Sequence, residues 1–371
     1  MIYARLYAPD IVASAFTDPG LGRGQRVMAG SSEKRVTLQK VAERAKVSPA
    51  TVSRVLNDAG RVKEAARARV LRAIDELNYH PNIHARTLAR GRSRTLGLIV
   101  SNLKNPFFLD VFQALEADAH EKGFEVMVAN TDYRPEQLLT HAKLMQGRRV
   151  AGLAVIVSEM EPTLIEGFLE SRIPIVFYDV GVAAGNCANI RTDYARGTRR
   201  VVEYLYSLGH RHLAFVGHHT ALAPLHVRER SFLDAVRDCG GDPARTTVVA
   251  EEDSPSGGLH ATRQLFASGF RPTAIVCVND FMALGVLKAL REMGLSVPRD
   301  VSVVGCDNIS LSEFACPALT TINIPRERIG HLVSAALMPN GEASPLWGRE
   351  IVIEPDLIIR DSTGPPPTAR R

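Results

Sequence analysis

The stretch that decides the fold of the N-terminal region is Val36–Asn57, which reads VTLQKVAERAKVSPATVSRVLN. Three of its apolar residues, Val41, Ala42 and Ala45, recur at the spacing of one helix face. Thr37 precedes them and can cap such a helix through its hydroxyl oxygen. The stretch therefore predicts a short amphipathic helix that ends at a tight connection.

A second helix is predicted to begin directly after that connection. Ser48 can cap it, and Pro49 suits its first position, where the missing N–H costs nothing. Val52, Val55 and Leu56 recur at helical spacing and would pack against the first helix. The side chains left on the outer face or at the exposed N-terminus are those of Pro49, Ala50, Thr51, Ser53 and Arg54.

The two helices fit a helix-turn-helix, in which the second helix presents its N-terminal residues to the major groove of DNA. Two short helices joined by a turn also occur in proteins that bind no DNA, so the spacing alone leaves both interpretations open. The next segment favours DNA binding, because 62–77 carries one apolar stripe and predicts a third helix. Asn78 can end that helix in the left-handed conformation, and Pro81 prevents its continuation.

Charge separates this region from the rest of the chain. Residues 31–94 hold 15 Lys and Arg and 6 Asp and Glu, a net charge of +9. Out of 45 basic and 40 acidic residues in all, 30 and 34 remain elsewhere, a net charge of −4. A basic region on a mildly acidic body is typical of proteins that bind the phosphates of nucleic acid. A solvated charged surface is the alternative.

Composition bounds the class of protein. The 371 residues allow two or three domains, and a hydrophobic fraction of 45% is enough for sizeable cores. No apolar run approaches the roughly 20 residues that span a bilayer, and residues 1–30 lack a secretory pattern. We therefore expect a cytoplasmic protein without membrane contact. The five cysteines form no CxxC or metal-type spacing and are expected to be free thiols.

Motifs for metal binding and catalysis are not found. The histidine pairs His218 with His219 and His210 with His212 lie without a cysteine or carboxylate at metal spacing. No nucleophile elbow, Walker loop or zincin motif is present. We therefore expect neither a metal nor a cofactor, and no enzyme.

From Thr95 onward, apolar strands alternate with predicted helices. Examples of such strands are 96–100, 152–157, 274–280 and 301–307. Apolar strands separated by helices predict parallel sheets covered on both faces, and two such rounds predict two doubly wound subdomains. Ligands in such folds bind at the carboxyl ends of the strands, so the cleft between the subdomains is the expected site.

Three motifs in this order, VSPATVSRVLN, ELNYHPN and ARTLARG, resemble the lactose-repressor (LacI/GalR) family of bacterial transcription regulators. The resemblance runs from near Val36 to about Arg360. It implies an all-α helix-turn-helix head and an α/β body of two doubly wound subdomains, similar to periplasmic sugar-binding proteins. Two departures are visible. The family often has an acid where Lys40 stands and a Ser or Thr cap where Lys63 stands, and both changes weaken helix capping.

The same patterns give the expected domain boundaries. Residues 1–35 have no sustained period, and Met28 is the expected start of the native protein. The expected regions are a disordered extension (1–35), the DNA-binding head (36–79), a hinge helix and linker (80–94), an effector-binding and dimerisation body (95–360) and a flexible tail (361–371). The expected parts of the body are a first subdomain of about 95–190 and 324–345 and a second of about 191–323 and 346–360.

The resemblance also implies which residues contact DNA. Arg54 can make a bidentate contact to guanine, whereas Pro49 and Ala50 offer only apolar contact. In relatives, the segment that matches 80–90 becomes helical on operator DNA, and a leucine, here Leu88, enters the minor groove and kinks the duplex. An ordinary linker leucine is the alternative. The residues implied in DNA binding are Thr37, Ser48, Pro49, Ala50, Thr51, Ser53, Arg54, Asn57, Asn82, Ala85, Arg86 and Leu88.

Polar and aromatic residues at the predicted strand ends match the effector site of the family. Arg228 matches an arginine that binds effector hydroxyls or carboxylates, and Phe107 matches a ring that stacks on the ligand. A core position for Phe107 and capping roles for Asp280 and Asp307 are the alternatives. Many sugar-responsive relatives carry an aromatic residue near Asp253, and none stands here, which puts a simple hexose in doubt. The implied effector-binding residues are Asn105, Phe107, Phe108, Asp179, Arg228, Asn279, Asp280 and Asp307.

The expected function is that of a transcription regulator, in particular a repressor, that binds a pseudo-palindromic operator. Its expected effector is a sugar or a related polyhydroxylated small molecule. The three prolines of STGPPPTARR forbid a helix at the end of the chain, so the helix that makes some relatives tetramers is not expected, and we expect a homodimer. A solute-binding protein, a regulator that responds to a nucleobase and a catalytic α/β protein are the alternatives.

Overall fold

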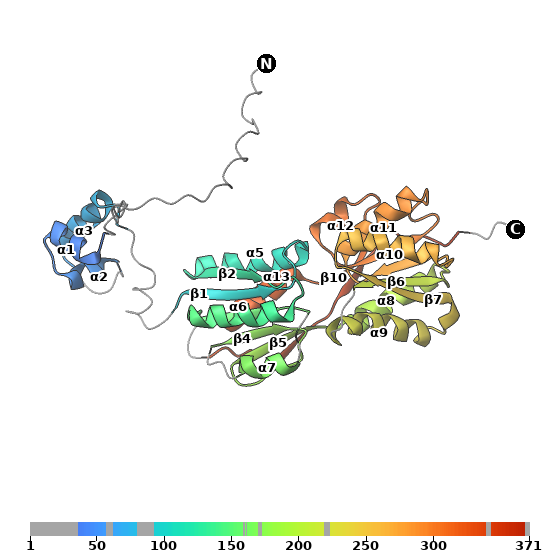
Figure 1. Ribbon diagram of the computed structural model, residues 1–371, viewed down its shortest axis with the longest axis horizontal. Helices are drawn as coiled ribbons and strands as arrows, with labels where there is room; N and C mark the ends of the chain where they lie inside the picture. Colours follow the sequence, from blue (N-terminus) through green and yellow to red (C-terminus); the bar gives the residue numbers. More distant parts are fainter. Residues whose placement is uncertain are drawn as a thin grey trace, which may run out of the picture. The chain divides into compact units, whose positions relative to one another are not determined.

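The chain divides into two compact units, residues 1–86 and 87–371, in a computed structural model (Figure 1). The structure describes residues 36–56, 62–79, 93–158, 160, 162–169, 173–218, 223–338 and 343–367. The extension expected at 1–35 and the hinge expected at 80–90 lie outside these residues. Each unit is described by itself.

The described part of the first unit contains three helices, α1 (Leu38–Ala45), α2 (Pro49–Leu56) and α3 (Glu64–Glu76). Thr37 caps α1, because its Oγ1 accepts a hydrogen bond from the backbone N–H of Lys40 at 3.4 Å. Ser48 caps α2, since its Oγ accepts from the N–H of Thr51 at 3.2 Å. Both predicted caps are therefore confirmed.

A small apolar core joins the three helices. Val41 of α1, Val52 of α2 and Val70 of α3 are fully buried in it. Asn78, with a φ of 45°, follows α3 in the left-handed conformation that the sequence predicted. Lys63 precedes α3, and its side chain makes no capping hydrogen bond to that helix, in agreement with the loss of a cap expected there.

The second unit contains two six-stranded sheets within the described residues, and Figure 1 shows helices on both faces of each. All neighbouring strands of the first sheet are parallel. Its strands, in spatial order, are β11 (Glu350–Ile353), β5 (Cys187–Thr192), β4 (Ile175–Tyr178), β3 (Gly152–Ile156), β1 (Thr95–Val100) and β2 (Glu125–Asn130). The helices around it are α5 (Pro106–Glu121), α6 (Pro135–Gly147), α7 (Pro162–Leu169) and α13 (Arg326–Leu337). We call this sheet with its helices the first subdomain.

The second sheet is parallel except for one edge strand, which runs antiparallel to its neighbour. Its strands, in spatial order, are β12 (Asp356–Ile358), β10 (Thr320–Asn323), β9 (Ser302–Asp307), β8 (Ala274–Cys277), β6 (Leu213–His218) and β7 (Thr246–Glu251). Its helices are α8 (Tyr194–Ser207), α9 (Ala223–Asp238), α10 (Pro255–Ala267), α11 (Asp280–Glu292), α12 (Ser310–Phe314) and a 3₁₀ turn at Pro243–Arg245. The two doubly wound subdomains that the sequence predicted are therefore confirmed.

The chain crosses between the two sheets at three places in the described residues: after β5, after β10 and after β11. The last crossing differs from the expected boundaries. The sequence assigned all of 346–360 to the second subdomain, but β11 pairs with β5 in the first sheet, and only β12 lies in the second. A four-residue strand at a sheet edge carries too weak a pattern to show which sheet it joins.

The end of the described chain also differs from expectation, because 361–367 is anchored to the second subdomain. Ser362 is fully buried, and its Oγ donates a hydrogen bond to the carbonyl oxygen of Val303 at 2.6 Å. The carbonyl oxygen of Gly364 lies 2.8 Å from Nε2 of the buried His210. The flexible tail predicted from residue 361 is therefore wrong for this segment.

None of the described helices combines the length and the apolar character that crossing a membrane requires.

Candidate DNA-binding face and effector cleft

The outer face of α2 carries the residues predicted to contact DNA. Val52 and Val55 turn inward to the core of the head and are buried. On the other side, Ser48, Pro49, Ala50 and Arg54 are exposed, while Thr51 and Ser53 are half-buried. The geometry thus separates a packing face from a polar, basic face that solvent can reach. Contact with DNA by these residues stays a prediction, as does that by Thr37 at the start of α1.

Five residues predicted to contact DNA lie outside the described part of the chain. They are Asn57, Asn82, Ala85, Arg86 and Leu88.

A cavity lies at the carboxyl ends of strands from both sheets of the body. It encloses about 40 Å³ of water-accessible space, and about 600 Å³ when the gaps out to its open side are counted. The smaller volume holds about three waters, so a sugar-sized ligand needs the walls of the cavity to separate. Seven of the eight residues predicted to bind an effector line it: Asn105, Phe107, Phe108, Asp179, Arg228, Asn279 and Asp307.

Arg228 of α9 is the central cation of the cavity. Its Nη1 donates to the carbonyl oxygen of Val278 at 3.0 Å, and its Nη2 donates to the hydroxyl of Tyr194 at 2.8 Å. Its Cζ lies 4.3 Å from the centre of the Tyr194 ring, within the range of a cation–π contact. Its Nε is buried, and no acceptor lies within hydrogen-bond distance of it among the described residues. This donor is therefore available to a ligand.

Asp179 and Tyr194 form a chain of hydrogen bonds with that arginine. The carboxylate of Asp179 accepts from the N–H of Thr192 at 2.7 Å and from the hydroxyl of Tyr194 at 2.9 Å. Burial raises the pKa of the Asp179 carboxyl to about 6, although these donors oppose the rise. Asp179 directly follows β4 and has a φ of 57°. Tyr194 thus joins a carboxylate of the first subdomain to Arg228 of the second.

Asp253 is a cleft residue that the prediction did not include among the binding residues. Its carboxylate accepts from Nδ2 of Asn279 at 2.7 Å and from the hydroxyl of Tyr133, which follows β2 in the first subdomain. Its carbonyl oxygen accepts from Nδ2 of Asn102, also in the first subdomain, at 3.3 Å. Asp253 therefore connects the two sides of the cleft.

Tyr133 also bears on the expectation that no aromatic residue stands near Asp253. None does in the sequence, but the ring of Tyr133 lies 4.6 Å from the ring of His218, and both line the cavity. The fold therefore supplies an aromatic surface from the other subdomain. The sequence cast doubt on a hexose effector because no aromatic residue stands near Asp253. With Tyr133 in the cavity, the absence of that residue no longer argues against a hexose.

Two aromatic rings that line the cavity come from the start of α5. Asn105 caps this helix, because its Oδ1 accepts from the N–H of Phe107 at 3.1 Å. The Phe107 ring meets Phe108 edge-on at 5.3 Å between centroids and lies 5.9 Å from the Tyr178 ring. Both phenylalanines are nearly buried and still line the cavity, so a core position and a ligand contact are compatible for Phe107.

Asp307 ends β9 and presents a buried carboxylate to the cavity. Burial, together with the nearby charges of Asp280 and Asp253, raises its pKa well above the ordinary value, although Arg228 opposes this. Its backbone has a φ of 109°, which L residues rarely adopt. The local backbone must therefore be held by its surroundings.

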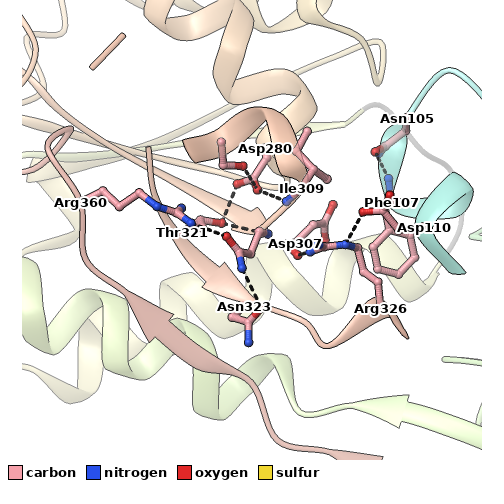
Figure 2. Close-up of polar contacts among 12 residues, drawn as sticks. Asn105, Phe107, Asp110, Asp280, Asp307, Ile309, Thr321, Asn323, Arg326 and Arg360 are labelled. Carbon is pink, nitrogen blue, oxygen red and sulfur yellow. Dashed lines mark hydrogen bonds and ion pairs between the residues drawn. The ribbon is translucent and has the colours of Figure 1, made fainter. Parts of the chain in front are cut away.

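Asp280 is the one predicted effector residue that does not line the cavity. Its buried carboxylate accepts from the N–H of Ile309 at 2.9 Å and from the hydroxyls of Ser312 and Thr321 at 2.5 and 2.6 Å. Figure 2 shows Asp280 turned toward the segment after β9. The prediction that Asp280 binds the effector is therefore corrected. Asp280 instead caps the segment after β9, which was the alternative.

The histidines considered as possible metal ligands in the sequence are not gathered at a metal site in the described residues. His210 is buried, with Nδ1 at 2.9 Å from Oγ1 of Thr273. His219 lies outside the described residues. No group of three His, Cys, Asp or Glu in the described part of the chain is placed to hold a metal ion.

Two protein families match the chain. The model for bacterial regulatory proteins of the lacI family matches residues 37–82, and the model for a periplasmic binding protein-like domain matches residues 202–363. The HTH-type transcriptional repressor PurR of Serratia proteamaculans (strain 568) is 33% identical over 334 residues, which cover 89% of this chain and 98% of that repressor.

Solved structures similar to this chain are also regulators of the same family. A lac repressor dimer bound to operator and the anti-inducer ONPF is 29% identical, with a TM-score of 0.77, covering 89% of this chain and 100% of that one. A LacI family transcriptional regulator from Enterococcus faecium with bound ribose is 28% identical, with a TM-score of 0.64, covering 73% and 99%.

A helix-turn-helix head followed by a periplasmic-binding-protein-like body defines a bacterial transcription regulator with a ligand-binding domain. The chain belongs to the LacI family of these regulators. Its matched relatives are transcription regulators, not enzymes.

Proposed function

We propose that this protein is a homodimeric repressor that binds a pseudo-palindromic operator and is controlled by a small, uncharged, polyhydroxylated effector. One observation carries the proposal. A helix with an exposed polar face and a cavity lined by carboxylates, an arginine and aromatic rings occur in one chain. Such a regulator acts on chromosomal DNA, so the proposed location is the cytoplasm. The role is regulatory and involves no catalysis.

The head supplies DNA recognition. Arg54 has the planar, two-donor geometry that fits the O6 and N7 atoms of guanine. Ser48, Thr51 and Ser53 are suited to phosphate oxygens, which position the head but carry no sequence information. Two heads related by a two-fold axis would read two half-sites of one palindrome. The related lac repressor was solved as a dimer on its operator, which supports this arrangement.

The cavity indicates the chemistry of the effector. Its described lining has three carboxylates, Asp179, Asp253 and Asp307, against one guanidinium, Arg228. A phosphate or carboxylate group on a ligand would meet more negative than positive charge there. Hydroxyl groups can donate to Asp307 and accept from Nε of Arg228, while the rings of Phe107 and its neighbours cover an apolar sugar face. The ribose bound to a related regulator supports a neutral sugar.

Effector binding would act through the width of the cleft. A ligand larger than the enclosed part of the cavity must favour a different spacing of its walls, and therefore a different relation between the two subdomains. In a dimer, that change would alter the placement of the segments that lead to the heads. The resulting coupling free energy is typically about 1–3 kcal/mol, and it acts equally on effector affinity and on operator affinity.

A salt titration of DNA affinity tests the proposed class. A repressor should show log K falling steeply with log salt on duplex DNA, with a slope set by its phosphate contacts. A solute-binding protein should bind no DNA at any salt concentration, and that result would contradict the proposal.

The effector class is tested by thermal shift against neutral sugars, the matching sugar phosphates and nucleobases. We expect a raised melting temperature with at least one neutral sugar, and no effect of its phosphate. Arg228→Met, which removes the central cation, should abolish the shift. The matched control Arg199→Met loses only an exposed ion pair with Asp238 on α8 and α9, so it should retain the shift. A response to a nucleobase or a phosphate alone would overturn the proposed class.

A further inference from the structure

Arg326 occupies the point where the chain passes from the second sheet to the first subdomain. It is the first residue of α13 and follows β10 by only Ile324 and Pro325. Helix α13 packs against α5, and Gly330 lies where a larger side chain would collide with Ala114 of that helix. The two helices therefore approach closely and are expected to move as one body.

The guanidinium of Arg326 binds both subdomains at once. Its Nε donates to Oδ2 of Asp110 on α5 at 2.7 Å, and its Nη1 donates to the carbonyl oxygen of Asp307 at the end of β9. Figure 2 shows these contacts on opposite sides of the planar group. The side chains of Arg326 and Asp110 are only 16% and 22% exposed, so solvent screens their ion pair less than a surface pair.

The two partners of Arg326 belong to opposite walls of the effector cavity. Asp110 lies one turn along α5 from Asn105, Phe107 and Phe108, which line the cavity from the first subdomain. The carboxylate of Asp307 lines it from the second. A single side chain outside the cavity thus connects the backbone of one wall to the helix that forms the other.

The turn that carries Asp307 is fixed to the second subdomain. Asn308 has a φ of 55°, and its Nδ2 donates to Oδ1 of Asn323 at 3.0 Å. Arg360 donates from Nη2 to Oδ1 of Asn308 at 2.8 Å, and Asp280 holds the N–H of Ile309. Because this turn is held at several points, Asp307 cannot shift without moving the residues bonded to the turn. Arg326 would pass such a shift on to α5 through its bond to Asp110.

We propose that Arg326 is a positioning residue that sets the spacing of the two cavity walls, and that it thereby couples the cavity to helix α5. Arginine suits this role because its donors lie in a fixed plane and can serve a carboxylate and a carbonyl together. The link to effector control rests on the proposed function, whereas the positioning of the walls does not.

Hydrogen exchange of the ligand-free, full-length protein tests the proposal. Arg326→Met should speed backbone exchange by about tenfold or more in two separate segments, 106–112 of α5 and 307–312 after β9. Asp110→Ala should do the same, including in 307–312, which Asp110 does not touch. The double variant should exchange no faster than Arg326→Met alone, because Asp110 acts through Arg326. The control Arg199→Met should leave both segments unchanged.

The outcomes separate positioning from a loss of local or global stability. Faster exchange at the start of α13 alone, or effects of the two substitutions that add, would overturn the proposal. So would a general rise in exchange across both sheets. Binding of duplex DNA by the wild-type protein is measured on the same samples. Its absence would refute the proposed function without altering the exchange result.

Discussion

Replacing Asp280 by asparagine tests whether this carboxyl group belongs to the packed interior of the second subdomain rather than to the effector site. Burial raises the pKa of the Asp280 carboxyl to about 6, from an ordinary value of 3.8. A raised pKa means that the protonated form favours the folded state. The contribution of protonated Asp280 to the free energy of unfolding is fully present below pH 3.8 and is lost as the pH rises through about 6.

The size of the effect follows from the two pKa values. At about 1.4 kcal/mol for each pH unit, the gap between 3.8 and about 6 corresponds to about 3 kcal/mol. In Asp280→Asn, the new amide side chain would stay neutral and could accept from the N–H of Ile309 with its oxygen, while Thr321 rotates its hydroxyl to accept. Between about pH 4 and pH 7, the free energy of unfolding should therefore fall by about 3 kcal/mol more in the wild type than in Asp280→Asn.

Urea unfolding followed by the fluorescence of Trp347, the single tryptophan, measures this difference. Asp280→Ala is the contrasting variant, since it leaves the donors of Ile309, Ser312 and Thr321 without their acceptor. The free energy of unfolding of Asp280→Ala should be lower than that of the wild type by at least about 2 kcal/mol at any pH. Equal pH dependence in the wild type and Asp280→Asn would refute the assignment, as would loss of effector binding in Asp280→Asn with unchanged stability.

Three further substitutions address DNA recognition and the cleft. Arg54→Met should weaken binding to a selected operator by about 10- to 100-fold in fluorescence anisotropy, the value of one bidentate base contact; an equal loss on random DNA would contradict that contact. Leu88→Ala should remove most of the specific affinity and leave non-specific binding largely intact, since a wedge acts only on a correctly placed duplex. Equal loss of both would argue for an ordinary linker residue. Tyr133→Phe removes a hydrogen bond to the Asp253 carboxylate that contributes about 1.5–3 kcal/mol to the contact between the two subdomains across the cleft. Small-angle scattering of the ligand-free protein should then show a larger radius of gyration, and an unchanged radius would contradict the role of this bond.

Local chemistry was enough to predict the head. The cap at Ser48, the proline at the start of α2 and the buried Val52 depend on neighbours within one or two turns. The strands with uninterrupted apolar runs, such as β1 and β3, were predicted for the same reason, since burial on both faces favours apolar residues throughout.

Elements whose stability comes from distant partners were not predicted. Strand β5 carries Asn189 and Arg191, so it lacks an apolar run, and both side chains bind Glu350 on β11. That partner lies about 160 residues away in the sequence. Neither strand can be identified without the other, and this explains the misplaced boundary near residue 350.

The cleft was predicted as far as strand ends could indicate it. Position after a strand identified Asn279 and Asp307, but it could not distinguish Asp280, whose side chain turns away to cap the segment after β9. Tyr133 and Asp253 were missed because they lie 120 residues apart on different subdomains and meet only in the folded chain. The signal that both residues share is a position a few residues after a strand, since Tyr133 follows β2 and Asp253 follows β7.

The most direct test of the central claim is selection of bound duplexes from random DNA by the purified full-length protein. The selection is run without ligand and again with a mixture of neutral sugars. The proposed function predicts enrichment of one palindrome in at least one condition, with a G·C pair at a position that loses its preference in Arg54→Met. Absence of an enriched palindrome in both conditions would contradict the assignment of this protein as an operator-binding repressor.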